Sequence, residues 1–233
     1  ATSIDWSRKF AQYARYDVVA LAMQAAEASI VRRRNNDGWH TILAALASRG
    51  LYVYDNEAAG GLFTKRLIAL TQIVLRRNAG GNSNSINRGK LTHVALSPES
   101  LADVRSWDAT QVDEMTRREI YIASEGSATL TKVFGVVLVD LDELGAGQEY
   151  DNYFINTLGG SYPGSKTEIA VGLDLVSGLQ KSFVMPWVVQ PNGQMIEMLN
   201  NPLLILENRD GYQGRLTYGA SILDDRYVVG MGI

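Results

Sequence analysis

The stretch YDVVALAMQAAEASIVRRR, Tyr16 to Arg34, decides the fold, because its apolar spacing fits only a helix. Apolar residues recur every three or four positions along two neighbouring stripes, which is the spacing of one helix face. The stripes are Ala14, Val18, Leu21, Ala25 and Ala28, and Val19, Met23, Ala26 and Ile30. Only Asp17, Gln24 and Glu27 form a polar strip, so at least two layers are expected to pack on the wide apolar arc. A core helix of any globular protein and the spine of a more specific architecture both fit this pattern.

The segments next to this helix carry signals for its two ends. Trp6, Phe10 and Tyr13 keep helical spacing and predict a lead-in helix before it. The run Asn35 to Gly38 predicts its end, because Asn and Gly accept the left-handed conformation found after a helix. A separate short helix is predicted over Thr41 to Ser48.

This end would place Arg32, Arg33 and Arg34 in the last helical turn. Positive charge there suits the helix dipole. The cluster is therefore either a solvated helix end or an intersubunit salt-bridge site.

The composition excludes several kinds of function. The 233 residues include no Cys and two His, so a disulfide framework and a thiolate metal site are both unavailable. No apolar run reaches the roughly 18 residues needed to cross a bilayer, so we expect a soluble protein without membrane partners. The formal charge of -3 lacks the basic surplus of a protein that grips nucleic acid. The first residue is Ala1, which leads us to expect a processed chain or a trimmed fragment.

Helices and strands alternate through the middle of the chain. The predicted segments are a strand from Leu51, a helix over Thr64 to Arg77, a strand from Leu91, a helix from Pro98, and a helix then a strand over Asp113 to Ala123. Ser97 is a natural cap for the helix that starts at Pro98. His93 has no partner in the sequence that would make it a base, so we interpret it as a partly buried structural histidine.

A glycine-rich loop, Asn78 to Gly89, separates two of these elements. It lacks the spacing of a phosphate-binding loop, because Gly89 and Lys90 are followed by Leu91 rather than Ser or Thr.

A buried strand over Val133 to Leu141 runs into the acidic residues Asp140, Asp142 and Glu143. Paired acids can bind a divalent cation or share a proton, but the following residues lack the pattern of a calcium loop. We therefore interpret this segment as a solvated loop, with a carboxylate-dependent hydrolase as the enzyme alternative.

The rest of the chain is rich in strands. They are predicted over Ile169 to Leu175, Phe183 to Val189 and Leu203 to Glu207, and two more close the chain on either side of Asp224 and Asp225. The sequence shows no G-x-S-x-G, HExxH or CxxC motif. We therefore predict no catalytic residue, no cofactor and no metal ligand, and we expect a protein that is not an enzyme.

In this order, the elements resemble the major capsid proteins of tailed bacteriophages, which have the Hong Kong 97 fold. Besides the long helix and the helix that precedes the flexible loop, three segments carry the resemblance: Ala95 to Trp107, Phe134 to Leu144, and the closing ENRDGYQGRLTYGASILDDRYVVGMGI. The resemblance implies an α+β fold with two domains. Residues 1–50 with 205–233 would form a peripheral domain of spine helix and strands, and residues 51–204 an axial domain with a central mixed sheet flanked by helices.

The resemblance also implies parts that are not seen in this sequence. The family carries an amino-terminal arm and a long extended loop before the spine helix, whereas about fifteen residues precede it here. We therefore expect a core that lacks the arm and the extended loop.

The resemblance implies a structural protein that assembles with itself into the pentamers and hexamers of an icosahedral shell. Such a shell would enclose phage or prophage DNA through non-specific contacts, with scaffolding or decoration proteins as further partners. The protein would be made in the bacterial host cytoplasm and reside in the virion capsid. An encapsulin-type nanocompartment shell, which encloses a cargo enzyme, is the alternative. The candidate residues for assembly interfaces are Arg32, Arg33, Arg34, Asn82, Asn84, Asn87, Asp224 and Asp225.

Overall fold

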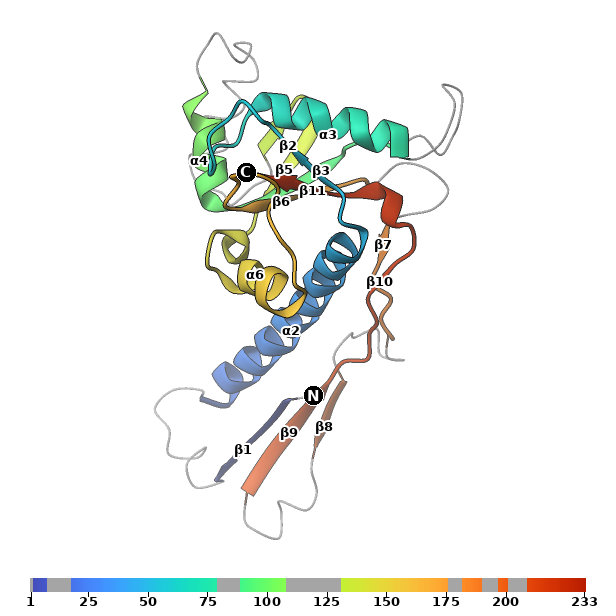
Figure 1. Ribbon diagram of the computed structural model, residues 1–233. Coiled ribbons are helices and arrows are strands. Elements are labelled where there is room, and N and C mark those ends of the chain that lie inside the picture. Colours follow the sequence, from blue (N-terminus) through green and yellow to red (C-terminus); the bar gives the residue numbers. More distant parts are fainter. Residues whose placement is uncertain are drawn as a thin grey trace. The chain divides into compact units, whose positions relative to one another are not determined.

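The computed structural model describes residues 2–7, 18–78, 89–107, 131–175, 182–189, 197–200 and 209–233 (Figure 1). The chain forms two compact units. Unit 1 comprises Ala1–Trp39 and Met185–Ser221, and unit 2 comprises His40–Val184 and Ile222–Ile233. No helix in the described ranges is long and apolar enough to cross a membrane.

The predicted spine is a single helix of 32 residues, α2 (Val18–Arg49). The predicted stop at Asn35 to Gly38 is wrong, and the separate helix predicted after it is the last part of α2. A glycine inside a helix costs about 1 kcal/mol. Three apolar residues after it, Ile42, Leu43 and Leu46, are buried, and burying each contributes roughly 1.5–3 kcal/mol, which outweighs that cost.

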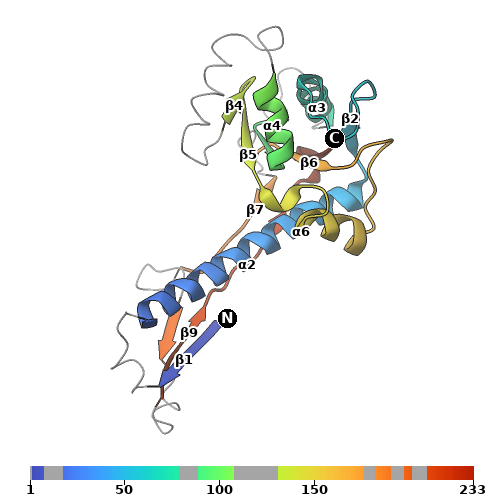
Figure 2. The same cartoon turned by 90° about the vertical axis from the view of Figure 1, so that its left-hand side faces the viewer.

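The prediction of a lead-in helix is also wrong, because Thr2–Ser7 forms strand β1. Strand β1 pairs antiparallel with β9 (Arg209–Arg215), which also pairs with β8 (Glu197–Asn200). The order Thr2, Ile4, Trp6 alternates with polar residues, and this period of two suits a strand. Phe10 and Tyr13 lie outside the described residues. In unit 1, β1 and β9 lie side by side next to the first turns of α2 (Figure 2).

A six-stranded mixed sheet forms the centre of unit 2, in agreement with the central mixed sheet that the resemblance implied. Its strands, in spatial order, are β2 (Tyr52–Tyr54), β11 (Val228–Gly232), β6 (Ile169–Leu173), β3 (His93–Leu96), β5 (Val136–Asp140) and β4 (Thr131–Val133). The pairs β11 with β2 and β3 with β5 are parallel, and the other pairs are antiparallel.

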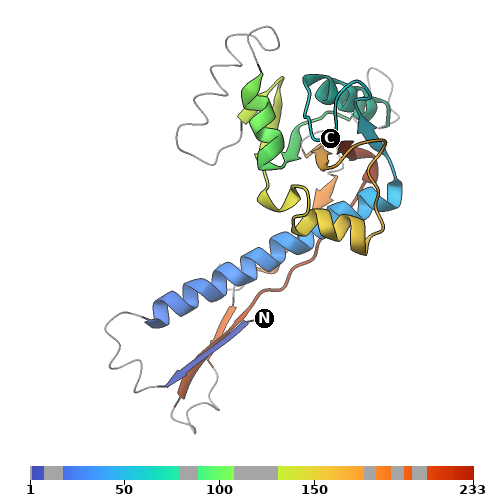
Figure 3. The ribbon, with the colours of Figure 1, turned by 60° about the vertical axis from the view of Figure 1, so that its left-hand side comes forward.

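Helices cover both faces of this sheet (Figure 3). The predicted helices α3 (Lys65–Asn78) and α4 (Pro98–Ser106) pack on one face, and Ser97 caps α4 as expected by accepting a hydrogen bond from the amide of Ser100 at 3.2 Å. The other face is covered by the end of α2, the short helix α6 (Glu149–Asn152) and the π-helix η2 (Tyr153–Thr157). The expected solvated loop after Glu143 therefore includes these helical turns, and Leu144 and Tyr150 in it are buried.

The buried strand predicted over Val133 to Leu141 is two strands. A turn at Phe134 and Gly135, with φ angles of 51° and 77°, separates β4 from β5. Positive φ at both central residues is typical of a tight hairpin turn. The predicted strands over Leu203 to Glu207 and within Asp113 to Ala123 lie outside the described residues.

The closing strands join different sheets. β10 (Ser221–Ile222) pairs with β7 (Phe183–Val184), whereas β11 pairs with β6 and β2. We expected residues 205–233 to belong to one domain with residues 1–50. In the structure residues 222–233 belong to unit 2, because β11 is an inner strand of the central sheet.

Candidate assembly surfaces

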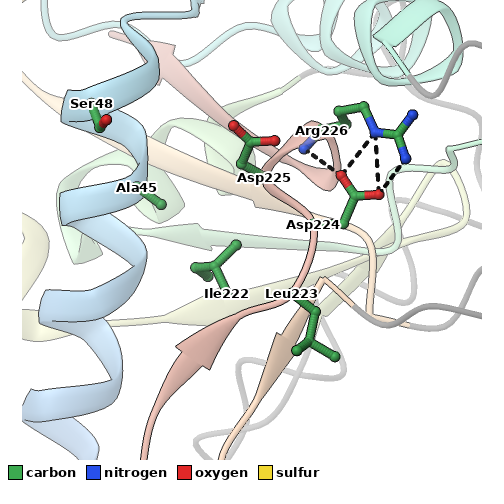
Figure 4. Close-up of a pocket in the computed structure, with 7 residues that line it drawn as sticks. All are labelled: Ala45, Ser48, Ile222, Leu223, Asp224, Asp225 and Arg226. Atoms are coloured by element: carbon green, nitrogen blue, oxygen red, sulfur yellow. Dashed lines mark hydrogen bonds and ion pairs between the residues drawn. The ribbon is translucent and has the colours of Figure 1, made fainter.

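One end of unit 2 brings the last turns of α2 against the segment that leads into β11 (Figure 4). An open cavity of about 500 Å³ lies between them. Its lining residues are Ala45, Ser48, Ile222, Leu223, Asp224, Asp225 and Arg226. We call this place the Asp225 corner.

Asp224 is held by bonds within the chain at this corner. Its carboxylate accepts hydrogen bonds from the Arg226 amide at 3.0 Å and from Arg226 Nε at 2.9 Å, and it forms an ion pair with Arg226 Nη2 at 2.6 Å. The hydrogen bonds from the Arg226 side chain hold the pKa of the Asp224 carboxyl below its usual range. Asp224 is therefore a buried cap of the 3-10 turn η4 (Asp225–Tyr227).

The outer rim of the corner presents Asp225 and Leu223 to solvent. Leu223 is 57% exposed, and Asp225 is also exposed. The backbone under this rim is fixed, because the Arg49 guanidinium donates to the carbonyl oxygens of Asp225 and Val228. The corner can therefore offer a partner an exposed apolar side chain and an exposed carboxylate on a backbone that Arg49 holds in place.

The arginine cluster lies in the middle of α2 rather than in its last turn, which carries Arg49. Arg32 and Arg33 are exposed, and Arg34 is half-buried, with its Nη2 donating to Asn35 Oδ1 at 3.3 Å. The predicted match with the end of the helix dipole is wrong, since the helix continues to Arg49.

Tyr218 and Asp37 form a contact within unit 1, in which the tyrosine hydroxyl donates to the carboxylate. Burial, and then the bond to Asp37, raise the pKa of Tyr218, whereas Arg33 and Arg34 lower it. The influence of these two arginines places the basic cluster near this contact.

Unit 1 has a strip of exposed apolar residues that the sequence did not predict. We had expected a strand over Phe183 to Val189. Trp187, Val188 and Val189 are 48%, 51% and 55% exposed. Trp187 forms an isolated bridge with Tyr218, and the Val188 amide donates to the Thr217 carbonyl at 2.9 Å. The flanking prolines, Pro186 and Pro191, were the available signal, because proline is confined to the edges of sheets.

The candidates Asn82, Asn84 and Asn87 lie outside the described residues, as does most of the glycine-rich loop.

The acids Asp140, Asp142 and Glu143 lie at the end of β5 and in the 3-10 turn η1 (Asp142–Leu144). Burial, and then the neighbouring charge of Asp142, raise the pKa of Asp140, whereas Arg105 lowers it. Asp140 and Asp142 are nevertheless exposed. Within the described part of the chain, no group of three or more His, Cys, Asp or Glu could hold a metal ion.

The described histidines have structural surroundings. His93 is half-buried, its Nδ1 lies 2.9 Å from Thr92 Oγ1, and burial lowers its pKa, which agrees with its interpretation as structural. His40 stacks on Tyr153 with ring centroids 3.9 Å apart.

A buried carboxyl, Glu168, lies beside the start of α4. Its Oε2 accepts a hydrogen bond from Ser97 Oγ at 2.8 Å. Burial raises the pKa of Glu168, and the Ser97 bond opposes this. Because Ser97 also caps α4, this contact ties the helix to the segment that leads into β6.

Scans against protein-family models and against curated protein sequences match nothing. Solved structures resemble the whole chain at low identity. The capsid of an empty GTA particle is similar with a TM-score of 0.59 and 10% identity, covering 100% of this chain and 71% of that one. The capsid of the cyanophage P-SCSP1u has a TM-score of 0.54 at 12% identity, over 99% of this chain and 70% of that one.

An encapsulin has the same architecture. The holo-SrpI encapsulin complex from Synechococcus elongatus PCC 7942 is similar with a TM-score of 0.52 and 13% identity, covering 99% of this chain and 71% of that one. The chain therefore has the α+β Hong Kong 97 capsid fold, and the resemblance found in the sequence is confirmed for the fold.

Proposed function

We propose that this chain is a major capsid protein, a structural subunit that assembles with copies of itself into the icosahedral shell around phage or prophage DNA. The observation that carries the proposal is the coverage of the fold. Between 99% and 100% of the chain matches capsid structures, so no part of it is left over as a separate catalytic domain. A shell subunit spreads its function over its contacts with other copies, in keeping with the exposed surfaces on both units.

In this proposal, unit 1 is the peripheral domain and unit 2 is the axial domain. Unit 2 would line the five- and six-fold axes, and Asn82, Asn84 and Asn87 remain candidates for contacts between subunits. Arg32, Arg33 and the Asp225 corner would meet neighbouring subunits. The exposed strip Trp187 to Val189 is a further candidate, because consecutive exposed apolar residues are typical of protein interfaces.

The partners of the shell follow from its charge. A formal charge of -3 suits a container that confines DNA through non-specific contacts without gripping each phosphate. Scaffolding or decoration proteins would be further partners. The subunit would be made in the bacterial host cytoplasm and would end in the virion.

Sedimentation with nuclease protection tests this function. The protein that carries this chain is produced together with the neighbouring genes of its prophage or phage, and lysate particles are treated with nuclease. A fast-sedimenting particle that contains this protein and protects double-stranded DNA is expected. A protein that remains in the slow fractions under all conditions would contradict the proposal.

An encapsulin-type shell is the second candidate, because the encapsulin complex resembles the chain over 99% of its length. The same particles distinguish the two. Particles that protect no DNA and contain a stoichiometric second protein would favour the encapsulin-type shell.

A further inference from the structure

Two buried carboxyl groups in the described part of unit 2, Glu168 and Asp151, form no ion pair. They are 7% and 4% exposed. Among the described residues, the Ser97 hydroxyl donates to Glu168 at 2.8 Å, and the Gly147 amide donates to Asp151 Oδ2 at 2.6 Å. The other oxygen of Asp151, Oδ1, is buried and has no hydrogen-bond partner in this part of the chain. An ionised carboxylate can accept several hydrogen bonds, so both groups are poorly compensated as anions.

Asp224 shows the contrasting case of a buried carboxyl that has a cation beside it. It is 8% exposed, forms an ion pair with Arg226 at 2.6 Å, and its pKa is lowered by the bonds from that side chain. Glu168 and Asp151 are buried to the same degree, but their pKa values are raised by burial, and the hydrogen bonds from Ser97 and Gly147 only oppose this. The fold therefore favours the ionised form of Asp224 and the protonated forms of the other two.

The described charges that act on Glu168 are all negative. Burial raises the pKa of Glu168, and the bond from Ser97 opposes this. The charges of Glu99 and Asp103, both on α4, and of Asp151 on α6 raise this pKa further. Glu168 and Asp151 are thus coupled, because an ionised Asp151 makes it harder for Glu168 to lose its proton.

The cations of the neighbouring elements are directed elsewhere. Helix α4 carries Arg105, which lowers the pKa of Asp140. The segment before β6 carries Lys166, whose Nζ donates to a carbonyl of the loop after β2, that of Ala58, at 2.8 Å. Helix α6 and strand β11 contain no Lys, Arg or His. These elements therefore do not neutralise the negative charges around Glu168.

Glu168 is one end of a chain of three buried oxygen atoms. Ser97 Oγ lies 2.8 Å from Glu168 Oε2 and 3.1 Å from Ser100 Oγ. Ser97 has one hydroxyl hydrogen, so it can donate to only one of these neighbours at a time. When Glu168 is protonated, it donates to Ser97, and Ser97 donates to Ser100. When Glu168 is ionised, Ser100 donates to Ser97, and Ser97 donates to the carboxylate. Because Ser97 also caps α4, the proton on Glu168 acts directly on the start of this helix.

We propose that Glu168 and Asp151 form a proton-binding latch that holds α4 and α6 against the segment leading into β6. With both carboxyl groups protonated, the three elements stay packed. As the protons leave, the buried negative charges repel one another, and the start of α4 and the turn at Gly147 open to water. A carboxyl whose pKa is raised in the folded state contributes stability that is lost as the pH rises through the folded value, so the latch is closed in acid and opens toward alkaline pH. This inference goes beyond the proposed shell function and does not depend on it.

Hydrogen exchange measured by mass spectrometry over a series of pH values tests the latch on the protein that carries this chain. Each rate is divided by the rate of an unstructured peptide at the same pH, which removes the intrinsic pH dependence of exchange. Protection of Ser97–Ser106 and Gly147–Asn152 should fall as the pH rises from the ordinary carboxyl pKa to the folded value. The fall should be up to about tenfold per pH unit for each proton released. Helix α3 is the internal control, and its protection should stay constant.

Two substitutions keep the shapes of the side chains but remove their ionisation, Glu168→Gln and Asp151→Asn. Each should make the pH dependence of protection in α4 shallower, and the double variant should abolish it. Glu27→Gln is the matched control, because Glu27 is exposed on α2 in unit 1. It should show the pH dependence of the wild type.

Three results would overturn the latch: a wild-type protection of α4 that does not change with pH, a double variant that keeps the wild-type slope, or an equal loss of protection in α3. The last result would mean that the whole unit opens rather than one part of it. The wild-type series decides the first and third results even if a variant fails to fold. The shell function is tested separately by sedimentation and nuclease protection, so either proposal can fail while the other stands.

Discussion

Asp224 and Asp225 are adjacent and chemically identical, but the fold buries only the first. Asp224 is 8% exposed and bonded to Arg226, whereas Asp225 is exposed on the rim of its corner. Both were candidates for an assembly contact on sequence grounds. The structure makes Asp225 the better candidate, because a partner can reach it without breaking an internal bond.

Asp224→Ala should therefore lower the free energy of unfolding by about 1–2 kcal/mol, because the variant loses the cap of η4 and the ion pair with Arg226. Because the pKa of Asp224 is lowered in the folded state, its contribution is complete above the ordinary carboxyl pKa and declines as the pH falls through the folded value. Urea unfolding at pH 7 and in acid measures both effects. Asp225→Ala is the matched control. If it lowers the free energy of unfolding as much as Asp224→Ala does, this account is contradicted.

Glu168 should respond to pH in the opposite direction. Its pKa is raised by burial, so its contribution to stability is complete below the ordinary carboxyl pKa and is lost as the pH rises through the folded value. Glu168→Gln keeps an acceptor for the Ser97 hydroxyl. At pH 7 the variant should have a free energy of unfolding higher than that of the wild type by on the order of 1 kcal/mol, measured by urea unfolding. This advantage should disappear in acid. An advantage that instead grows in acid would contradict the assignment.

At the scale of the elements, strand β11 needs a glycine at position 230, because the Tyr52 ring lies too close for a side chain there. A side chain at Gly230 would place its Cβ 2.5 Å from Tyr52 Cδ1. The Tyr52 ring is held in place, because its hydroxyl donates to the Leu46 carbonyl at 3.3 Å.

Gly230→Ala should therefore destabilise the protein by about 1–3 kcal/mol through overpacking. Gly219→Ala is the control, since its nearest neighbour outside the adjoining residues would be 3.8 Å away. Thermal unfolding of the two variants makes the comparison. Equal melting temperatures would show that the sheet relaxes around Tyr52.

The β4–β5 hairpin should gain stability when its strained aromatic residue is replaced. Asn-Gly is the preferred pair for a turn with two positive φ angles, so Phe134→Asn should raise the free energy of unfolding by up to about 1 kcal/mol. Urea unfolding of the dissociated subunit measures this. A destabilised subunit would show that the ring's packing on Trp107 outweighs the strain.

The elements that were predicted correctly are those whose signals are local. Ser97 and Pro98 mark the start of α4, because a capping hydroxyl and a proline act within one turn of the helix. The local signals for strand β1 conflicted, because Thr2, Ile4 and Trp6 alternate with a period of two whereas Trp6, Phe10 and Tyr13 keep helical spacing. Its partner β9, which decides the outcome, lies some two hundred residues further along the chain. The turn at Phe134 was missed because apolar residues on both sides conceal it, and phenylalanine is not expected at positive φ.

The candidate surfaces were less predictable than the fold. Whether Trp187 is exposed depends on what covers it, which the local sequence does not encode. The cavity beside Phe134 is lined by residues of a helix and a hairpin that are more than fifty residues apart in the sequence.

At the scale of the whole molecule, the function that we propose is that of a subunit whose surfaces meet copies of itself. The described histidines and Glu168 have structural surroundings, and the acids after β5 are exposed rather than gathered around a cavity. The exposed apolar residues are spread over both units: Trp187 to Val189 in unit 1, and Phe134 and Leu223 in unit 2. Such a distribution suits several contacts per subunit better than it suits one binding site.

Single-particle electron microscopy of the purified protein that carries this chain tests this account most directly. It predicts a closed icosahedral shell in which unit 2 surrounds the rotational axes. A uniform population of separate monomers, at concentrations and salt conditions that span those of a cell, would contradict it.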